Sequence, residues 1–362
     1  MVKKESLSKI LNQFDFKGEC SCRECHGVGN INDTTIVTYN CDGKDIKYIV
    51  QRINHSIFTN PEALMDNMRK VTLHIADKVK REGGDLSREC LNLVQTKERN
   101  YFYKTEQGSY YRAFNFISDA KTYMKVENEK HMYETGKAIG KFHKQLSDFN
   151  ADSLYEVIKD FHNTPKRYID FQNAIKEDKA GRVALVKEEI DFIEKRADEL
   201  SKLVNLASDG KIPVRVTHND TKFNNVMIDD STGKAVCIID LDTVMPGLSL
   251  YDIGDAIRSG CSTAEEDEVD LSKVTIDINL YNNFVEGLLK ESKDTLNECE
   301  IENIPFSAKL ITIELAMRFL TDYINGDTYF KVSTERANHN LERTRNQLKL
   351  VEEMERNFKD IS

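Results

Sequence analysis

Two neighbouring stretches of the chain decide its fold. Residues 216–230 read V-T-H-N-D-T-K-F-N-N-V-M-I-D-D, and residues 235–247 read A-V-C-I-I-D-L-D-T-V-M-P-G. The first stretch places Asn225 five residues after Asp220, and the second is an apolar run that ends in Asp240. We interpret them as a polar loop followed by a hairpin, which brings a carboxylate back to the side chains of the loop.

This spacing suits phosphoryl transfer, a reaction that depends mainly on positioning and charge. Asp220 is the predicted catalytic base, facing an acceptor hydroxyl, and His218 is expected to brace the loop. Asn225 and Asp240 are the predicted ligands of Mg²⁺, which bridges the phosphates of ATP. Asp242 is a further metal candidate because side chains two apart on a strand face the same way; its alternative role is to cap the next turn. The alternative for the whole motif is a polar turn between two core strands.

The pattern along the chain predicts an α+β, two-lobed, protein-kinase-like fold. Residues 1–118 form the expected small, sheet-rich, nucleotide-binding lobe, and residues 119–362 the large, mostly helical lobe with the catalytic loop. Strands are predicted at 34–39, 47–53, 90–96 and 109–117, and a helix follows Asn60-Pro61. Further helices are predicted at 128–148, 183–206, 250–260, 275–292, 306–325 and 336–359.

Composition excludes some classes of function. The net charge of −10 gives no support for binding nucleic acid, so phosphates must be met by local cations or metal. No apolar run is long enough to cross a membrane, and the first residues lack the apolar core of a signal peptide. We therefore expect a cytoplasmic protein with reduced thiols that acts on small molecules.

Candidates for nucleotide binding lie in the first part of the chain. Gly27 and Gly29 precede the first strand, where glycines let backbone amides approach phosphate closely; an ordinary tight turn is the alternative. Arg52 ends the second strand and is the predicted phosphate-binding cation, unless it is only a surface residue. Asp66, on the first long helix, is its predicted partner, with Glu62 as second choice.

A cluster of cysteines lies beside the two glycines. Cys20, Cys22 and Cys25 are followed by His26, and the last part matches the haem-attachment pattern C-x-x-C-H. Haem attachment would require export, which nothing in the sequence indicates. A zinc site would have compressed spacing for tetrahedral ligands, so free thiols are favoured.

These motifs resemble the aminoglycoside phosphotransferase/choline kinase superfamily over most of the chain. The resemblance is carried by G-V-G-N-I-N-D-T at 27–34, Q-R-I-N at 51–54, I-D-L-D-T-V-M-P-G at 239–247 and R-F-L-T-D-Y-I-N-G-D-T-Y-F-K at 318–331. Within the superfamily the motifs are most similar to the N-acetylhexosamine 1-kinases, which phosphorylate the anomeric hydroxyl of GlcNAc and GalNAc.

The resemblance implies an ATP- and Mg²⁺-dependent sugar 1-kinase with Asp220 as its base. It also implies that Arg318, Tyr329 and Asn30 contact the sugar, although relatives often have His at the position of Asn30 and Glu at that of Asp66. Two alternatives stay open: a kinase of the same fold acting on an aminoglycoside, an amino alcohol or another sugar, and a non-catalytic pseudokinase sensor. The complete set of predicted catalytic and metal residues argues against the sensor.

Overall fold

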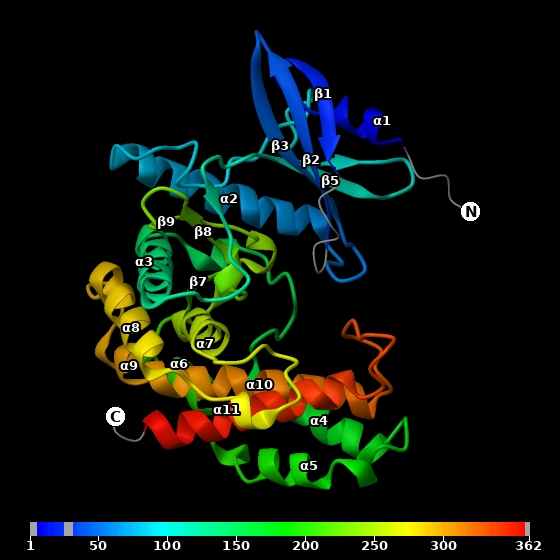
Figure 1. Cartoon of the computed structure of the whole chain (residues 1–362), viewed down its shortest axis with the longest axis vertical. Coiled ribbons are helices and arrows are strands. Elements are labelled where there is room, and N and C mark those ends of the chain that lie inside the picture. The colour runs from blue at the N-terminus through cyan, green and yellow to red at the C-terminus, as the bar shows by residue number, and fades with distance from the viewer. Residues whose placement is uncertain (1–5, 25–31, 359–362) are drawn as a thin grey trace.

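The computed structural model describes residues 6–24 and 32–358 and confirms the predicted α+β class. In Figure 1 a curled sheet with one long helix lies above a larger helical part. The sheet is antiparallel, in the order β1-β2-β3-β5-β4. Its strands are β1 Glu19–Glu24, β2 Asp33–Cys41, β3 Lys44–Ile53, β4 Tyr103–Lys104 and β5 Tyr110–Asn115.

The β2–β3 hairpin sets which side chains of the sheet face the rest of the molecule. Asp42 and Gly43 form its two-residue turn with positive φ at both positions, as a type I′ turn requires. Along β3 the side chains alternate without a bulge. Tyr48 and Val50 pack in the cluster around α1 (Leu7–Leu11), whereas Ile53 packs with the long helix α2 (Pro61–Arg81).

Helix α2 begins as its sequence predicts. The Asn60 side chain accepts a hydrogen bond from the Ala63 backbone, and Pro61 occupies the first helical position. Its apolar face lies in a core that also contains Val216, Leu241 and Val244 from the hairpins of the second part. One continuous core therefore joins the sheet-rich and helical parts.

Two small sheets carry the motif identified in the sequence. One consists of β7 (Arg215–Thr217) and β10 (Met245–Gly247), and the other contains β6 (Ala120–Lys121), β8 (Val226–Asp229) and β9 (Ala235–Ile238). The loop 218–225, which the sequence predicts to be catalytic and which is called the catalytic loop below, joins β7 to β8. A 3₁₀ turn at Leu241–Thr243 joins β9 to β10, so the predicted loop and hairpin are both present.

Helices build the rest of the large part (Figure 1). They are α3 Glu129–Gln145, α4 Thr164–Glu177, α5 Lys187–Glu194, α6 Lys202–Ser208, α7 Ser249–Gly260, α8 Ile278–Ser292, α9 Glu298–Glu302, α10 Ile304–Ile324 and α11 His339–Asn357. Among the helices that the structure describes, none has the length and apolar character that a membrane span needs.

Two predicted elements are wrong. Residues 90–96 form no regular strand; Leu93 and Thr96 make only isolated bridges, to Phe114 and Phe14. The helix predicted at 183–206 is broken into 3₁₀ turns and the short helices α5 and α6. In the first stretch the backbone bonds go to separate segments, from Val94 to Ala113 and from Thr96 to Asn100, so no regular ladder forms.

Candidate active site

Asp220 lies in the catalytic loop next to two groups that fix its carboxylate. Lys222 Nζ is 3.1 Å from its Oδ1 atom. The Asn225 amide nitrogen donates to the Asp220 carbonyl at 2.8 Å and lies 3.3 Å from Oδ2. This commits the nitrogen of Asn225 to the loop, so its amide oxygen points away from Asp220. The structure thus brings together two of the predicted site residues.

A residue of helix α7 binds the backbone of the catalytic loop. Both carboxylate oxygens of Asp252, which is fully buried, accept backbone hydrogen bonds, from Asn219 at 2.7 Å and His218 at 2.9 Å. Burial opposes ionisation of Asp252, but the bond and charge of His143 outweigh it and lower the pKa of the carboxyl. Asp252 therefore supports the loop through the backbone of His218 and Asn219.

His218 ties the catalytic loop to residues 239–244. This segment is called the metal turn below because it contains Asp240, a predicted metal ligand. Its Nε2 atom lies 2.9 Å from the Ile239 carbonyl, which can only accept, so Nε2 carries the proton. Its Nδ1 atom then accepts from the Asp220 backbone at 3.2 Å. The Ile239 backbone in turn donates to the Asn225 carbonyl at 2.9 Å. The residue before Asp240 is thus tied to the catalytic loop.

Asp240 directly follows that tie and has a left-handed backbone, with φ of +65°. Asp240 is exposed to solvent. Surrounding protein atoms nevertheless raise the pKa of its carboxyl to about 6, and the negative charges of Asp242 and Asp220 act in the same direction. Crowded negative charge of this kind suits a cation. Within the described residues no group of three or more His, Cys, Asp or Glu is arranged for a metal.

Asp242, whose charge acts on Asp240, is itself buried and paired. Its side chain is 5% exposed, and its oxygens pair with Arg112 of β5 and with the Asn32 amide at 2.5 Å. The strand alternation on which the metal prediction for Asp242 rested is wrong, because the chain enters a 3₁₀ turn after Asp240 instead of continuing as a strand. A metal-binding role for Asp242 stays a prediction.

The predicted ion pair between Arg52 and Asp66 is also wrong. Arg52 lies 3.6 Å from Asp33 on the neighbouring strand, and Asp66 pairs within its own helix with Arg69 and Lys70. The alternation of side chains along β3 explains why Arg52 does not reach Asp66. Arg52 follows the alternation of Tyr48 and Val50, which face α1, away from α2. A role for Arg52 in holding phosphate stays a prediction.

Several predicted residues lie outside the described part of the chain. They are Gly27, Gly29 and Asn30, together with Cys25 and His26 of the cysteine cluster. Cys20 and Cys22 are exposed free thiols in β1. The glycine loop and a zinc site therefore stay untested. Glu62 pairs with Lys104 and Tyr110, so it does not serve Arg52 either.

Arg318 lies in an aromatic cluster near the loop. Its guanidinium is 5.1 Å from the ring centre of Phe161 and 5.5 Å from that of Phe330. Tyr329 packs edge-on against Phe330 and is 61% exposed, so its face is open to a ligand. Burial lowers the pKa of Arg167, as does the positive charge of Arg318, which places the two guanidinium groups near one another. The two predicted sugar anchors, Arg318 and Tyr329, thus share one cluster.

Buried polar groups connect this aromatic cluster to the catalytic loop. The carboxylate of Glu314 on α10 bonds His162 Nδ1 at 2.8 Å and the Thr164 hydroxyl at 2.5 Å. Burial opposes its ionisation, but the charge and bond of His162 lower its pKa overall. The other nitrogen of His162 lies 3.4 Å from the Asn219 carbonyl.

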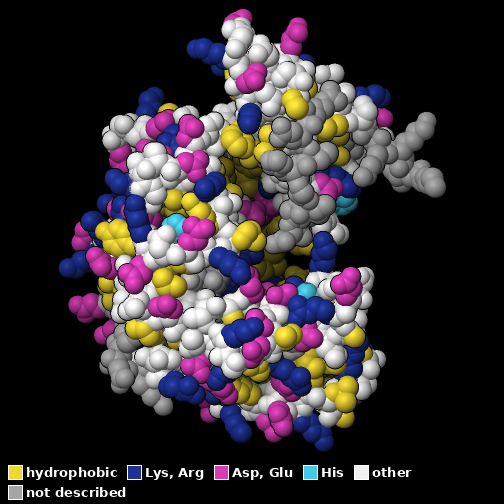
Figure 2. All heavy atoms as spheres, viewed as in Figure 1, with side chains coloured by type: hydrophobic (Ala, Val, Ile, Leu, Met, Phe, Trp, Pro, Cys, Tyr) yellow, Lys and Arg dark blue, Asp and Glu magenta, His cyan; other side chains and the backbone are white. Residues whose placement is uncertain are grey.

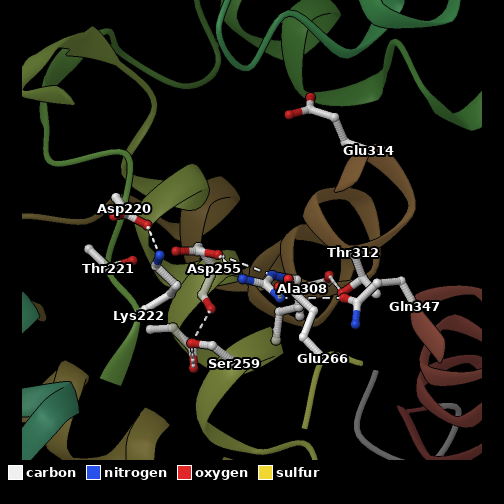
Figure 3. Close-up of polar contacts among 12 residues, drawn as sticks. Asp220, Thr221, Lys222, Asp255, Ser259, Glu266, Ala308, Thr312, Glu314 and Gln347 are labelled. Atoms are coloured by element: carbon white, nitrogen blue, oxygen red, sulfur yellow. Dashed lines mark hydrogen bonds and ion pairs between the residues drawn. The ribbon is translucent and has the colours of Figure 1, made fainter. Parts of the chain in front are cut away.

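Sequence reasoning missed Lys222, although it lies within the quoted motif. The negative charge of Asp220 raises the pKa of Lys222 against the effect of burial, and Asp255 adds to the rise. Figure 3 shows Lys222 extending toward Asp220, with Asp255 beside it. Beyond it lies a cavity of about 140 Å³ whose lining includes Lys222, Arg258 and Glu266. The sequence could have indicated Lys222, because it is a cation only two residues after Asp220, the predicted base.

Figure 2 shows the surface hollowed between the two parts of the molecule. A small sheet-rich lobe, a helical lobe and an Asp–Asn–Asp set at their junction define a phosphotransferase of the kinase-like class. The chain belongs to the APH phosphotransferase enzyme family, whose model matches residues 26–274.

Solved structures agree on the fold. A microcompartment-associated aminopropanol kinase is 16% identical, with a TM-score of 0.60 and 95% of each chain covered. An aminoglycoside phosphotransferase from Alicyclobacillus acidocaldarius is 13% identical, with a TM-score of 0.61 and coverage of 98% of this chain and 97% of that one. An amicoumacin kinase, solved with AMP-PNP, Ca²⁺ and Ami, is 12% identical, with a TM-score of 0.61 and coverage of 96% and 93%.

Proposed function

We propose that this protein transfers the γ-phosphoryl group of ATP to the anomeric hydroxyl of a 2-acetamido hexose, with Mg²⁺ as cofactor. The observation that carries the transfer chemistry is the arrangement of Asp220. Its carboxylate is fixed by Lys222 and the Asn225 amide, in a loop whose backbone is bound by a buried carboxylate. A group so constrained orients an acceptor hydroxyl and accepts its proton with little reorganisation.

The residues present fit Mg²⁺ and nucleotide. The Asn225 amide oxygen points away from Asp220, and Asp240 lies among acidic groups whose repulsion a cation would relieve. These two side chains would hold the metal, which would offset the charge that develops on the phosphates. The solved amicoumacin kinase holds an ATP analogue together with a divalent cation, which supports the same cofactors here.

Lys222 supplies a positive charge beside the proposed base. Its ammonium group lies 3.1 Å from Asp220, and the raised pKa keeps it protonated at neutral pH. In that position it holds the Asp220 carboxylate by charge. It would also stabilise negative charge on a transferred group bound next to Asp220.

The aromatic cluster supports a neutral sugar as acceptor. Tyr329 offers an exposed ring, and Arg318 offers donors to hydroxyl or acetamido oxygens. The charges of Arg167 and Arg318 are opposed by the buried carboxylate of Glu314, so the proposal of a neutral acceptor rests on the ring of Tyr329 and the donors of Arg318, not on net charge. Asn30, Arg318 and Tyr329 remain the proposed sugar contacts.

The acceptor can be identified from the products. Purified protein is incubated with ATP and Mg²⁺ and with GlcNAc, GalNAc, glucose, galactose, ethanolamine or an aminoglycoside, and ³¹P and ¹H NMR then locate the phosphate. We expect an anomeric phosphate on GlcNAc or GalNAc, and slower turnover of the plain hexoses because they leave buried polar groups unpaired. Phosphorylation only of the amino alcohol or aminoglycoside would refute the sugar assignment and retain the kinase chemistry.

A further inference from the structure

Arg112 of β5 is the largest fully buried side chain of the described residues, and the mechanism above does not use it. Its side chain is 1% exposed and forms an ion pair with Asp242, which belongs to the turn after Asp240. The pair joins the small lobe to the large one. Burying two charges is costly unless both are fully bonded, so such a pair calls for a specific explanation.

The hydrogen bonds around this pair link four separate segments. Arg112 donates from Nε and Nη2 to the Gln51 side chain of β3, at 3.0 and 2.8 Å. The second oxygen of Asp242 accepts from Asn32 at 2.5 Å, and Asn32 in turn accepts from the Asn54 backbone at 2.9 Å. In sequence Asn32 is three residues after Gly29. The ion pair therefore connects β5, β3, the metal turn and the start of β2.

A second tie joins the metal turn to the small lobe. Asn67 of α2, which is 1% exposed, donates to the Val244 carbonyl at 2.9 Å and to the Tyr155 carbonyl at 2.7 Å. Residues 242 and 244 are thus bound to the small lobe, whereas Ile239 is bound to the catalytic loop through His218. Asp240, which has a left-handed backbone, lies in sequence between these two sets of contacts.

We propose that Arg112 is a positioning residue for phosphoryl transfer, which acts through Asp242 to fix the metal-binding Asp240 relative to the nucleotide-binding lobe. The proposal rests on the proposed function, since Asp240 needs a defined place only if metal and nucleotide meet there. An arginine is suited to this task because its planar fork bonds Gln51 and Asp242 at the same time. A lysine could satisfy only part of this set.

Replacing Arg112 alone would leave Asp242 buried and unpaired, so a misfolded variant would be uninformative. The informative variant is R112M/D242N, which removes both charges at similar volume. A matched control is R196M/E355Q, which removes a less buried pair between the segment after α5 and α11, bonded at 2.7 and 2.9 Å, far from the metal turn in sequence. R112K tests whether charge without the fork is sufficient.

We expect R112M/D242N to fold with a melting temperature near that of the wild type but to lose at least about 10² in kcat, the effect of a reactive group misplaced by about 1 Å. The KM of the acceptor should change less than about threefold. R112K should recover only part of kcat, and the control pair should leave both constants unchanged. A double variant with kcat within about threefold of the wild type would overturn the proposal.

Hydrogen exchange of the ligand-free protein supplies a readout that does not depend on catalysis. In R112M/D242N, amide exchange should rise in residues 32–38, which contain neither substitution, as well as in residues 241–247, which contain D242N. Exchange that rises only within β5 and residues 241–247 would contradict the coupling. If the wild type phosphorylated none of the acceptors, the proposed function would fail, while this exchange result would still decide whether Arg112 holds the metal turn.

Discussion

Asp220 keeps one carboxylate oxygen beside Lys222 and the other beside the Asn225 amide. Asp220→Asn preserves the shape of the side chain but removes its charge and basicity. We expect kcat to fall about 10²–10⁴-fold, the usual range for a lost general base. Binding of Mg²⁺-ADP, measured by calorimetry, should stay within about threefold because the residue faces the acceptor. Near wild-type turnover would rule out this role.

Asp240 should make metal binding sensitive to pH. Its pKa is raised to about 6, so it binds a proton as pH falls through that value, and the proton competes with Mg²⁺. The apparent Mg²⁺ affinity in the presence of ADP should therefore weaken between pH 7 and pH 5. Titrations at several pH values with wild type and Asp240→Asn would measure this, and an affinity that is flat over this range would contradict it.

The same shift has a consequence for stability with a defined sign. The folded protein holds the Asp240 proton more tightly than the unfolded chain, whose ordinary value is 3.8. This group therefore stabilises the ligand-free fold at low pH and loses that contribution as pH rises from about 4 to 6. The difference in unfolding free energy between wild type and Asp240→Asn should change across this window in that direction.

Residue spacing predicted some of the site and missed the rest for a physical reason. Asp220, Asn225 and Asp240 were predicted because a loop and a hairpin fix their distances in sequence. Arg112 could not be predicted, since its partner Asp242 lies 130 residues away and only the fold brings them together. Arg112 is a single cation in the strand 110–115, and a strand can also carry such a residue on a face exposed to solvent, so the sequence gave little indication that it is buried.

At the scale of elements, the sequence patterns did not show which side chains of β3 face helix α2. The hairpin, its turn and helix α2 followed from Asp42-Gly43 and Asn60-Pro61, whose conformational preferences are local. Which face of β3 meets α2 depends on one residue of register. Gln51, bonded to Arg112, is on the face that meets α2, and Arg52 is not. The predicted ion pair failed for this reason.

Helix α7 offers a test of how the catalytic loop is supported. In Asp252→Asn an amide group replaces one of two oxygens that both accept hydrogen bonds, so a donor would meet a donor. We expect a loss of at least about 2 kcal/mol in unfolding free energy, and a lower kcat. The matched control is Asp277→Asn, since Asp277 also accepts two backbone bonds, at the start of α8, where one side-chain oxygen suffices. Equal losses in both variants, measured by denaturant unfolding, would show that Asp252 only caps.

For the whole molecule, the continuous core through α2 and Leu241 predicts that ligand binding stabilises both lobes together. Saturating Mg²⁺-ADP, at about 1,000 times its dissociation constant, should add about 4 kcal/mol to the unfolding free energy. Calorimetry should show one transition that moves upward by several degrees. Adding EDTA, or using Asp240→Ala, should remove most of this shift; a shift of equal size without metal would contradict the metal assignment.

The transfer machinery and the proposed acceptor contacts come from different stretches of chain. Asp220, Asn225 and Asp240 lie within 21 consecutive positions of the sequence, whereas Arg318 and Tyr329 belong to α10 and the segment after it. Insertions, deletions and substitutions in the later stretch could therefore accumulate during evolution without disturbing the chemistry. Such separation would let descendants of one ancestral gene acquire new acceptors, and it gives protein engineers a defined region in which to randomise specificity.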